Sequence, residues 1–91
     1  MSQQKKVSMT NQFKRDLKKQ YLLLVSPEWS EVFGTLVKNG ILDEKYKNHY
    51  LSGNYIGHLE CHVKPDLLLI YKNTSDELTL TRLGSHSELF G

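Results

Sequence analysis

The chain of 91 residues is poor in the features that mark secreted or membrane proteins. It has one cysteine, Cys61, which excludes an internal disulfide, and it shows no basic and apolar leader. Its longest apolar runs, residues 21–25 and 67–71, are much too short to cross a membrane. We therefore expect a soluble protein of the reducing cytoplasm, folded as one domain over residues 1–91.

The sequence also lacks the signatures of several kinds of site. There is no CxxC or HExxH pattern, no glycine-rich phosphate loop and no GxSxG elbow. His58 and His62 lie about 13 Å apart if they share a strand, too far to bind one metal ion. Cys61 then points away from its neighbour His62 and is better interpreted as a small core residue. We expect no metal ion and no small-molecule cofactor.

The chain also has little excess of one charge sign, since its net charge is only +2. Its distribution is uneven: residues 1–20 hold six basic side chains and one acidic, whereas the remainder is acidic on balance. Lys14 and Lys18 fall on one face of a predicted helix. Such a basic face can follow RNA phosphates, meet an acidic partner protein, or simply be solvated.

Two helices are predicted in the first half of the chain. Phe13, Leu17, Tyr21 and Leu24 recur at helical spacing after a cap at Thr10 or Asn11, which predicts about four turns. A second helix follows the cap and first turn Ser26-Pro27-Glu28, its apolar residues lie between 29 and 37, and Gly40 suits its C′ position.

Strands dominate the second half. Residues 58–63 alternate between polar and apolar, Pro65 follows in a turn, and the apolar run 67–71 predicts a strand buried on both faces. Residues 77–83 alternate again, although the direction of Arg82 depends on whether a bulge interrupts them. Tyr50 and Leu51 are expected to need burial within an ordered loop. The fold class is α+β: two N-terminal helices pack on one face of a small, mainly antiparallel sheet and leave the other face exposed.

The polar residues that remain suit RNA cleavage by proton transfer. A metal-independent reaction needs a base for the 2′-hydroxyl, an acid for the leaving 5′-oxygen and a cation for the phosphate. Histidine serves either proton-transfer role near neutral pH. These functions are available from five side chains: His49, His62, Asp66, Arg82 and His86. Each histidine considered alone is more often a surface or structural residue. For Asp66, the alternative is that it only forms hydrogen bonds within its own turn, as an aspartate after proline often does.

Three blocks in fixed order carry a family resemblance: NHYLSG (48–53), CHVKPD (61–66) running into LLLIY, and RLGSHSELF (82–90). Together they resemble the YafQ branch of the RelE-type bacterial toxins. The resemblance implies a RelE-like toxin fold and a toxin of a type II toxin–antitoxin pair. It also implies a ribosome-dependent endoribonuclease, an mRNA interferase that cuts mRNA without metal.

The same resemblance implies roles for individual residues. His86 would transfer a proton at the scissile phosphate with Asp66 or His62 as its partner, Arg82 would neutralise the phosphate, and His49 would position the substrate or share the proton transfer. Phe90 would shape the substrate site and, with Lys14 and Lys18, contact RNA. The implied partners are a cognate antitoxin, which would bury apolar residues such as Leu23 or Leu24, and mRNA on the ribosome.

Two positions depart from the family pattern. Asn48 stands where aspartate is common in this branch, and His58 is additional to its functional set. We expect His58 to be peripheral. The alternative function is a non-catalytic RNA- or protein-binding module of the same fold, whose histidines are incidental.

Overall fold

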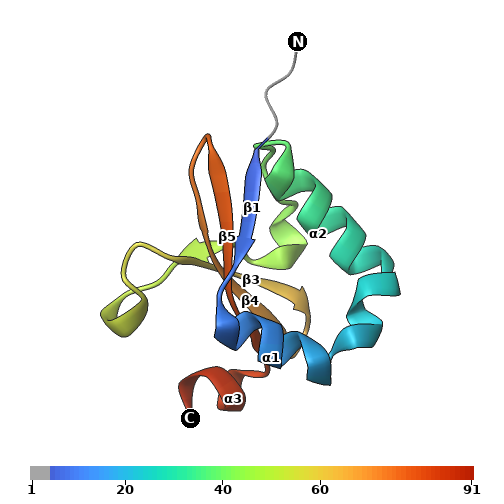
Figure 1. Ribbon diagram of the computed structural model, residues 1–91, viewed down its shortest axis with the longest axis vertical. Coiled ribbons are helices and arrows are strands. Elements are labelled where there is room, and N and C mark those ends of the chain that lie inside the picture. Colours follow the sequence, from blue (N-terminus) through green and yellow to red (C-terminus); the bar gives the residue numbers. More distant parts are fainter. Residues whose placement is uncertain (1–4) are drawn as a thin grey trace.

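The computed structural model describes residues 5–91 (Figure 1). Three α-helices and five strands are joined by short 3₁₀ turns. In chain order they are β1 (Lys6–Met9), α1 (Asn11–Lys19), the 3₁₀ turn η1 (Tyr21–Val25), α2 (Pro27–Val37), η2 (Glu44–Tyr46), β2 (His49–Tyr50), η3 (Gly53–Tyr55), β3 (Leu59–Lys64), β4 (Leu67–Asn73), β5 (Glu77–Gly84) and α3 (His86–Phe90).

The strands form one sheet in the order β1-β5-β4-β3-β2. β1 runs parallel to β5, and the other neighbours are antiparallel. Helices α1 and α2 lie together on one face of this sheet (Figure 1). The α+β prediction with two helices on one face of a mainly antiparallel sheet is therefore confirmed.

The main core lies between these helices and the sheet. It includes Phe13 of α1, Trp29 and Val32 of α2, and the strand residues that face them. Those strand residues alternate along each strand, as a half-buried sheet requires. They are Cys61 and Val63 of β3, Leu67, Leu69 and Tyr71 of β4, and Leu78, Leu80 and Leu83 of β5.

Helix α1 is shorter than its sequence pattern predicts. It ends at Lys19, and η1 continues with three residues per turn, so the apolar side chains no longer share one face. Only Leu23 of this segment is buried, while Tyr21 and Leu24 are 64% and 50% exposed. The prediction that both extend the apolar face of the helix is wrong.

The end of α2 also differs by one residue from the prediction. Ser26 caps the helix and Pro27 begins it, as expected, but Asn39 rather than Gly40 adopts the left-handed conformation, with φ of 60°. Asparagine tolerates this conformation better than most residues. The backbone N–H of Gly40 then donates to Thr35 O at 2.8 Å, which closes the helix.

The second face of the sheet is not left open. Leu68 and Ile70 of β4 point to it and are covered by Leu89 of α3, with Leu51 and Tyr55 packed alongside. β4 is therefore buried on both faces, as predicted, whereas the prediction of an exposed second face is wrong at its centre. Tyr50 does not take part in this cluster and is 75% exposed, so its predicted burial is wrong too.

A bulge in β5 settles the direction of Arg82. Ile70 pairs with Arg82, but the next residue, Tyr71, pairs with Leu80, which leaves Thr81 as the extra residue. An extra residue moves every later side chain to the opposite face. Arg82 consequently shares a face with Ile70, and Leu83 returns to the main core beside Leu69.

Candidate active site

The register of the sheet assembles polar residues on the face that α3 partly covers. One cross-strand row runs from His49 of β2 through Glu60 and Ile70 to Arg82. The next row runs from His62 through Leu68 to Gly84, immediately before α3. Since strands lie about 4.8 Å apart, His62 and the start of α3 are within roughly 10 Å. Residues from four strands and α3 thus share one surface.

Glu60 is the centre of the first group. Its side chain is 6% exposed, and Oε1 lies 3.3 Å from His49 Nε2 and 3.8 Å from His62 Nε2. Its second oxygen, Oε2, is buried without a hydrogen-bond partner among residues 5–91. A buried carboxylate with a free oxygen is costly. Such a group is typical of a site rather than of a packing contact.

The contacts of His49 constrain its protons. Nδ1 lies 2.7 Å from the backbone carbonyl of Lys47, which can only accept, so Nδ1 carries a proton. Nε2 faces the Glu60 carboxylate, and a hydrogen bond there requires a proton on one of the two groups. Lys47 is held in the left-handed region, with φ of 52°, where its carbonyl meets the ring. The ring of His49 is therefore fixed with Nε2 against the buried carboxylate of Glu60.

Asp66 and His86 form the second group. Asp66 lies in the turn between β3 and β4, and its Oδ1 accepts a hydrogen bond from the backbone N–H of His86 at 3.3 Å. Ser85 and Glu88 cap α3 reciprocally: Glu88 N–H donates to Ser85 Oγ at 3.2 Å, and Ser85 N–H donates to Glu88 Oε1 at 2.7 Å. These contacts hold the exposed His86 ring at the edge of the face.

Aromatic side chains border this second group. The rings of His86 and Phe90 lie 5.1 Å apart, and Phe90 meets Tyr55 of η3 edge to face at 6.1 Å. Tyr55 in turn meets His58 at 5.8 Å. The loop that follows β2 therefore packs against α3, which joins the two ends of the face.

The α3 cap makes a pH-dependent prediction. Hydrogen bonds from Ser85 lower the pKa of Glu88 below its ordinary value of 4.5. Because this pKa is lowered, the ionised Glu88 carboxylate stabilises the cap at pH values above 4.5. This stabilisation is lost as the pH falls through the lowered pKa. We expect the Ser85 amide proton resonance to shift with a midpoint below 4.5, and the shift to vanish in Glu88→Gln. A midpoint at or above 4.5 would contradict the cap.

Arg82 does not stand free on the face. Its Nε donates to Asp16 Oδ2 of α1 at 2.8 Å and its Nη2 to Asp16 Oδ1 at 3.3 Å, while Leu83 N–H donates to Asp16 Oδ2 at 3.0 Å. The hydrogen bonds to Asp16 raise the pKa of Arg82, burial opposes this rise, and Tyr55 adds to it. Asp16 thus holds a permanently charged guanidinium in one orientation.

Removal of this pair should be costly for the fold. Both side chains are less than a fifth exposed, and Asp16→Ala would leave the guanidinium and Leu83 N–H without their acceptor. We expect a loss of about 2–3 kcal/mol in the free energy of unfolding, measured by urea denaturation. The exposed Asp76→Ala serves as control, with about 0.5 kcal/mol or less. Equal effects of the two substitutions would show that the pair is dispensable.

The structure brings together most of the side chains that the sequence singled out. His49 lies with His62, Asp66 lies with His86 and Phe90, and Arg82 occupies the same cross-strand row as His49. Lys14 and Lys18 are exposed on α1. His58 precedes β3 instead of lying within it. The catalytic and RNA-binding roles of these residues stay predictions.

Two contributors were missed from the sequence. Glu60 alternates with His62 along the strand, a signal that places it on the polar face, yet nothing local distinguishes it from a solvated glutamate. Tyr71 belongs to the apolar run that predicts only a buried strand, but its hydroxyl donates to Asn48 Oδ1 at 2.6 Å and anchors the residue before His49. Asn48, one of the two predicted departures from the family pattern, is thus held in place by this hydrogen bond.

Cys61 takes no part in the site. It is fully buried in the main core, and burial raises the pKa of its thiol to about 12. Its prediction as a small core residue is confirmed. Within residues 5–91, no group of three or more histidine, cysteine, aspartate or glutamate side chains is arranged to hold a metal ion. No helix over the same residues is both long and apolar enough to span a bilayer.

Fold and site together define a small toxin-like α+β domain with a histidine and carboxylate face. The family model described as "Bacterial toxin of type II toxin-antitoxin system, YafQ" matches residues 5–91. The chain therefore belongs to the YafQ family of toxins, which confirms the resemblance read from the sequence.

Individual relatives agree with this assignment. The mRNA interferase toxin YafQ of Escherichia coli strain B is 33% identical, over 97% of this chain and 98% of the relative. The crystal structure of YafQ from E. coli BL21(DE3) superposes with a TM-score of 0.85 at 31% identity, covering 97% of this chain and all of that one. A chain of the E. coli DinJ-YafQ toxin–antitoxin complex superposes with a TM-score of 0.83 at 32% identity, covering 98% of this chain and 100% of that one.

Proposed function

We propose that this toxin is an endoribonuclease that cleaves mRNA on the translating ribosome by general acid and base catalysis, without a metal ion. The observation that carries the proposal is the paired arrangement of His49 and His62 around Glu60, on the face where Asp66 contacts the start of α3. The E. coli relative named an mRNA interferase supports it.

The roles follow from position. His86 is exposed at the edge of the face and transfers a proton at the scissile phosphate, partnered by Asp66 or His62. His49, beside Glu60, shares the proton transfer or positions the substrate. Arg82, oriented by Asp16, neutralises charge that develops on the phosphate. Phe90 borders the place where the adjoining base lies, and Lys14 and Lys18 attract the RNA backbone.

The partner proposed for inhibition is a cognate antitoxin, as in the DinJ-YafQ complex of E. coli. Leu24 and Val25 are 50% and 82% exposed on η1, and apolar groups of this kind become buried in protein interfaces. Leu23, also considered from the sequence, is only 4% exposed and already belongs to the core, so it is unavailable to a partner.

The test is cleavage of a defined mRNA in a purified translating system, mapped by primer extension. We expect discrete cuts in register with codons that require both the ribosome and this protein. Isolated RNA with added EDTA tests the metal requirement separately, because ribosomes themselves need magnesium. Absence of cuts in every format, with the RNA still bound, would favour the binding-module alternative.

A further inference from the structure

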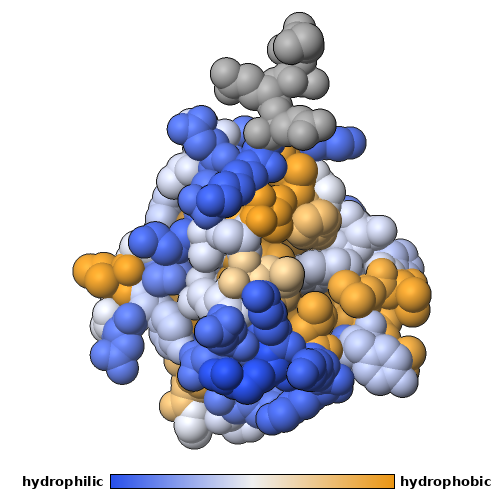
Figure 2. All heavy atoms as spheres, in the orientation of Figure 1, coloured by the Kyte–Doolittle hydropathy of each residue, from blue (hydrophilic) through white to orange (hydrophobic). Residues whose placement is uncertain are grey.

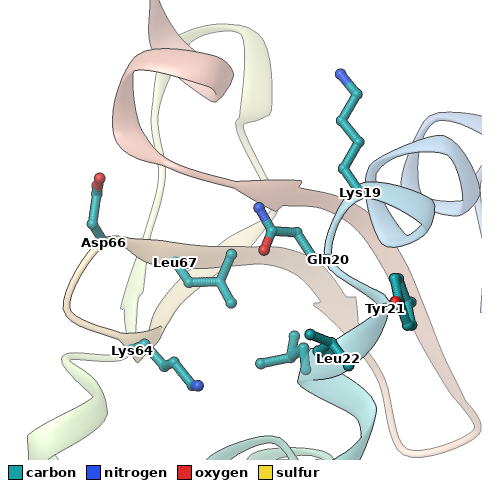
Figure 3. A pocket seen from close by; sticks show the side chains of 8 residues that line it. Lys19, Gln20, Tyr21, Leu22, Lys64, Asp66 and Leu67 are labelled. Carbon is teal, nitrogen blue, oxygen red and sulfur yellow. The ribbon is translucent and has the colours of Figure 1, made fainter.

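A hollow of about 390 Å³ lies beside Asp66. It forms where η1 approaches the turn between β3 and β4 (Figure 3). Its lining includes Lys19, Gln20, Tyr21, Leu22, Lys64 and Leu67. None of these six side chains belongs to the proposed catalytic groups.

The hollow exists because α1 ends early. Gln20 is the C-cap residue of α1, and the chain then turns into η1, so the Gln20 side chain points back toward the sheet. Figure 3 shows its amide on one side of Leu67 and the Lys64 side chain on the other, with Leu22 close by. A continuous helix would give residues 20–22 a different phase and would not place Gln20 here.

The lining offers what a nucleotide needs. Lys64 supplies an ammonium group for phosphate oxygens at one end of the hollow, whereas the Lys19 side chain points away from it (Figure 3). The Gln20 amide presents both donors and an acceptor, the combination that recognises a base edge. Leu22 and Leu67 form an apolar wall against which a base can pack.

Position favours RNA over another occupant. Asp66 lines the hollow and also accepts a hydrogen bond from His86, so the hollow adjoins the proposed cleavage site. Lys64 additionally lines a second hollow of about 400 Å³ that contains His62, Lys45 and Lys47. An RNA strand that crosses the β3–β4 turn would therefore meet cations on both sides of Lys64.

We propose that the hollow beside Asp66 binds one nucleotide of the RNA next to the scissile phosphate. Lys64 holds its phosphate, and Gln20 reads the edge of its base. The inference rests on the proposed function, because it takes the histidine face as the place of cleavage. It adds a determinant of sequence preference at one flanking position.

Binding can be tested without cleavage. AMP, CMP, GMP, UMP and inorganic phosphate are each titrated into the ¹⁵N-labelled protein while the Gln20 side-chain amide and the Leu67 backbone amide are followed by NMR. We expect saturable shifts, with a Kd on the order of 1–10 mM for at least one mononucleotide. Identical shifts from phosphate alone would reduce the hollow to an anion site, and no shift from any probe would overturn the proposal.

Variants then separate the two parts of the site. Lys64→Gln should weaken mononucleotide binding about fivefold, and Gln20→Leu should reduce the preference among the four bases. The controls are Lys72→Gln and Gln12→Leu, whose exposed side chains lie outside both hollows and which should leave binding unchanged. If the control variants lost binding or base preference to the same extent, the effect would come from net charge or helix content, and the assignment would be contradicted.

In the ribosomal cleavage assay, Gln20→Leu should change which base flanks the cut, and the control Gln12→Leu should leave that preference unchanged. An unchanged preference would overturn the role of Gln20, even if the protein is an active ribonuclease. If instead Gln20→Leu and Lys64→Gln leave RNA binding intact but weaken antitoxin binding tenfold, the hollow is a protein-docking site.

Discussion

His86→Ala should reduce the rate of mRNA cleavage by about 10²–10⁴-fold, the range expected when a group that transfers a proton in the transition state is removed. The imidazole is exposed, and its anchoring contact to Asp66 uses the backbone N–H, which alanine retains. The fold should therefore survive. Cleavage of a defined mRNA in the translating system, with protein saturating, measures the effect directly.

A second histidine supplies the control for this substitution. His58 lies before β3 with its ring against Tyr55, outside both catalytic groups. His58→Ala should remain within about threefold of the wild-type rate. If His86→Ala retained more than a tenth of the activity, proton transfer by this residue would be excluded and the reaction would have to rely on His49 and His62.

Glu60→Gln should lower cleavage by about 10²-fold while it leaves the melting temperature unchanged or raises it. Glutamine has nearly the shape of glutamate but lacks the charge that faces both imidazoles. A nearly buried carboxylate with one unpartnered oxygen destabilises the folded state, so its neutralisation removes a cost. Opposite signs for activity and stability are the mark of a functional charge.

The two measurements are cleavage in the translating system and thermal unfolding followed by circular dichroism. Glu44→Gln, at an exposed position in η2, is the matched control and should affect neither quantity. A lower melting temperature together with lost activity would make Glu60 a structural partner of His49. Activity within threefold of wild type would exclude it from the reaction.

Opposite effects on activity and on stability can be expected at this face because it combines buried apolar side chains with buried polar ones. Leu68, Ile70 and Leu89 form a small second core directly beside the histidines. Burial of these side chains holds α3 against the sheet, while the Glu60 carboxylate beside them keeps one oxygen without a hydrogen-bond partner. Natural sites accept such a local cost where the chemistry requires it.

Elements whose pattern is local were predictable. The cap Ser26, the apolar run 67–71 and the alternation around Cys61 each depend on neighbours in sequence, and each appears as expected. The end of α1 was not predictable in this way. Leu24 has helical spacing from Leu17, but the chain changes to a 3₁₀ turn that buries Leu23 in the main core.

The sequence by itself determined the fold class, the family and the histidines, because strand period, helix caps and the three blocks near the C-terminus are local properties of the chain. Only the tertiary structure decided that Glu60 lies between two imidazoles, that Asp16 holds Arg82 and that α3 covers Leu68 and Ile70. These contacts depend on the order and register of strands and on the Thr81 bulge. Residues brought together in this way are far apart in sequence, and no local pattern specifies which of them meet.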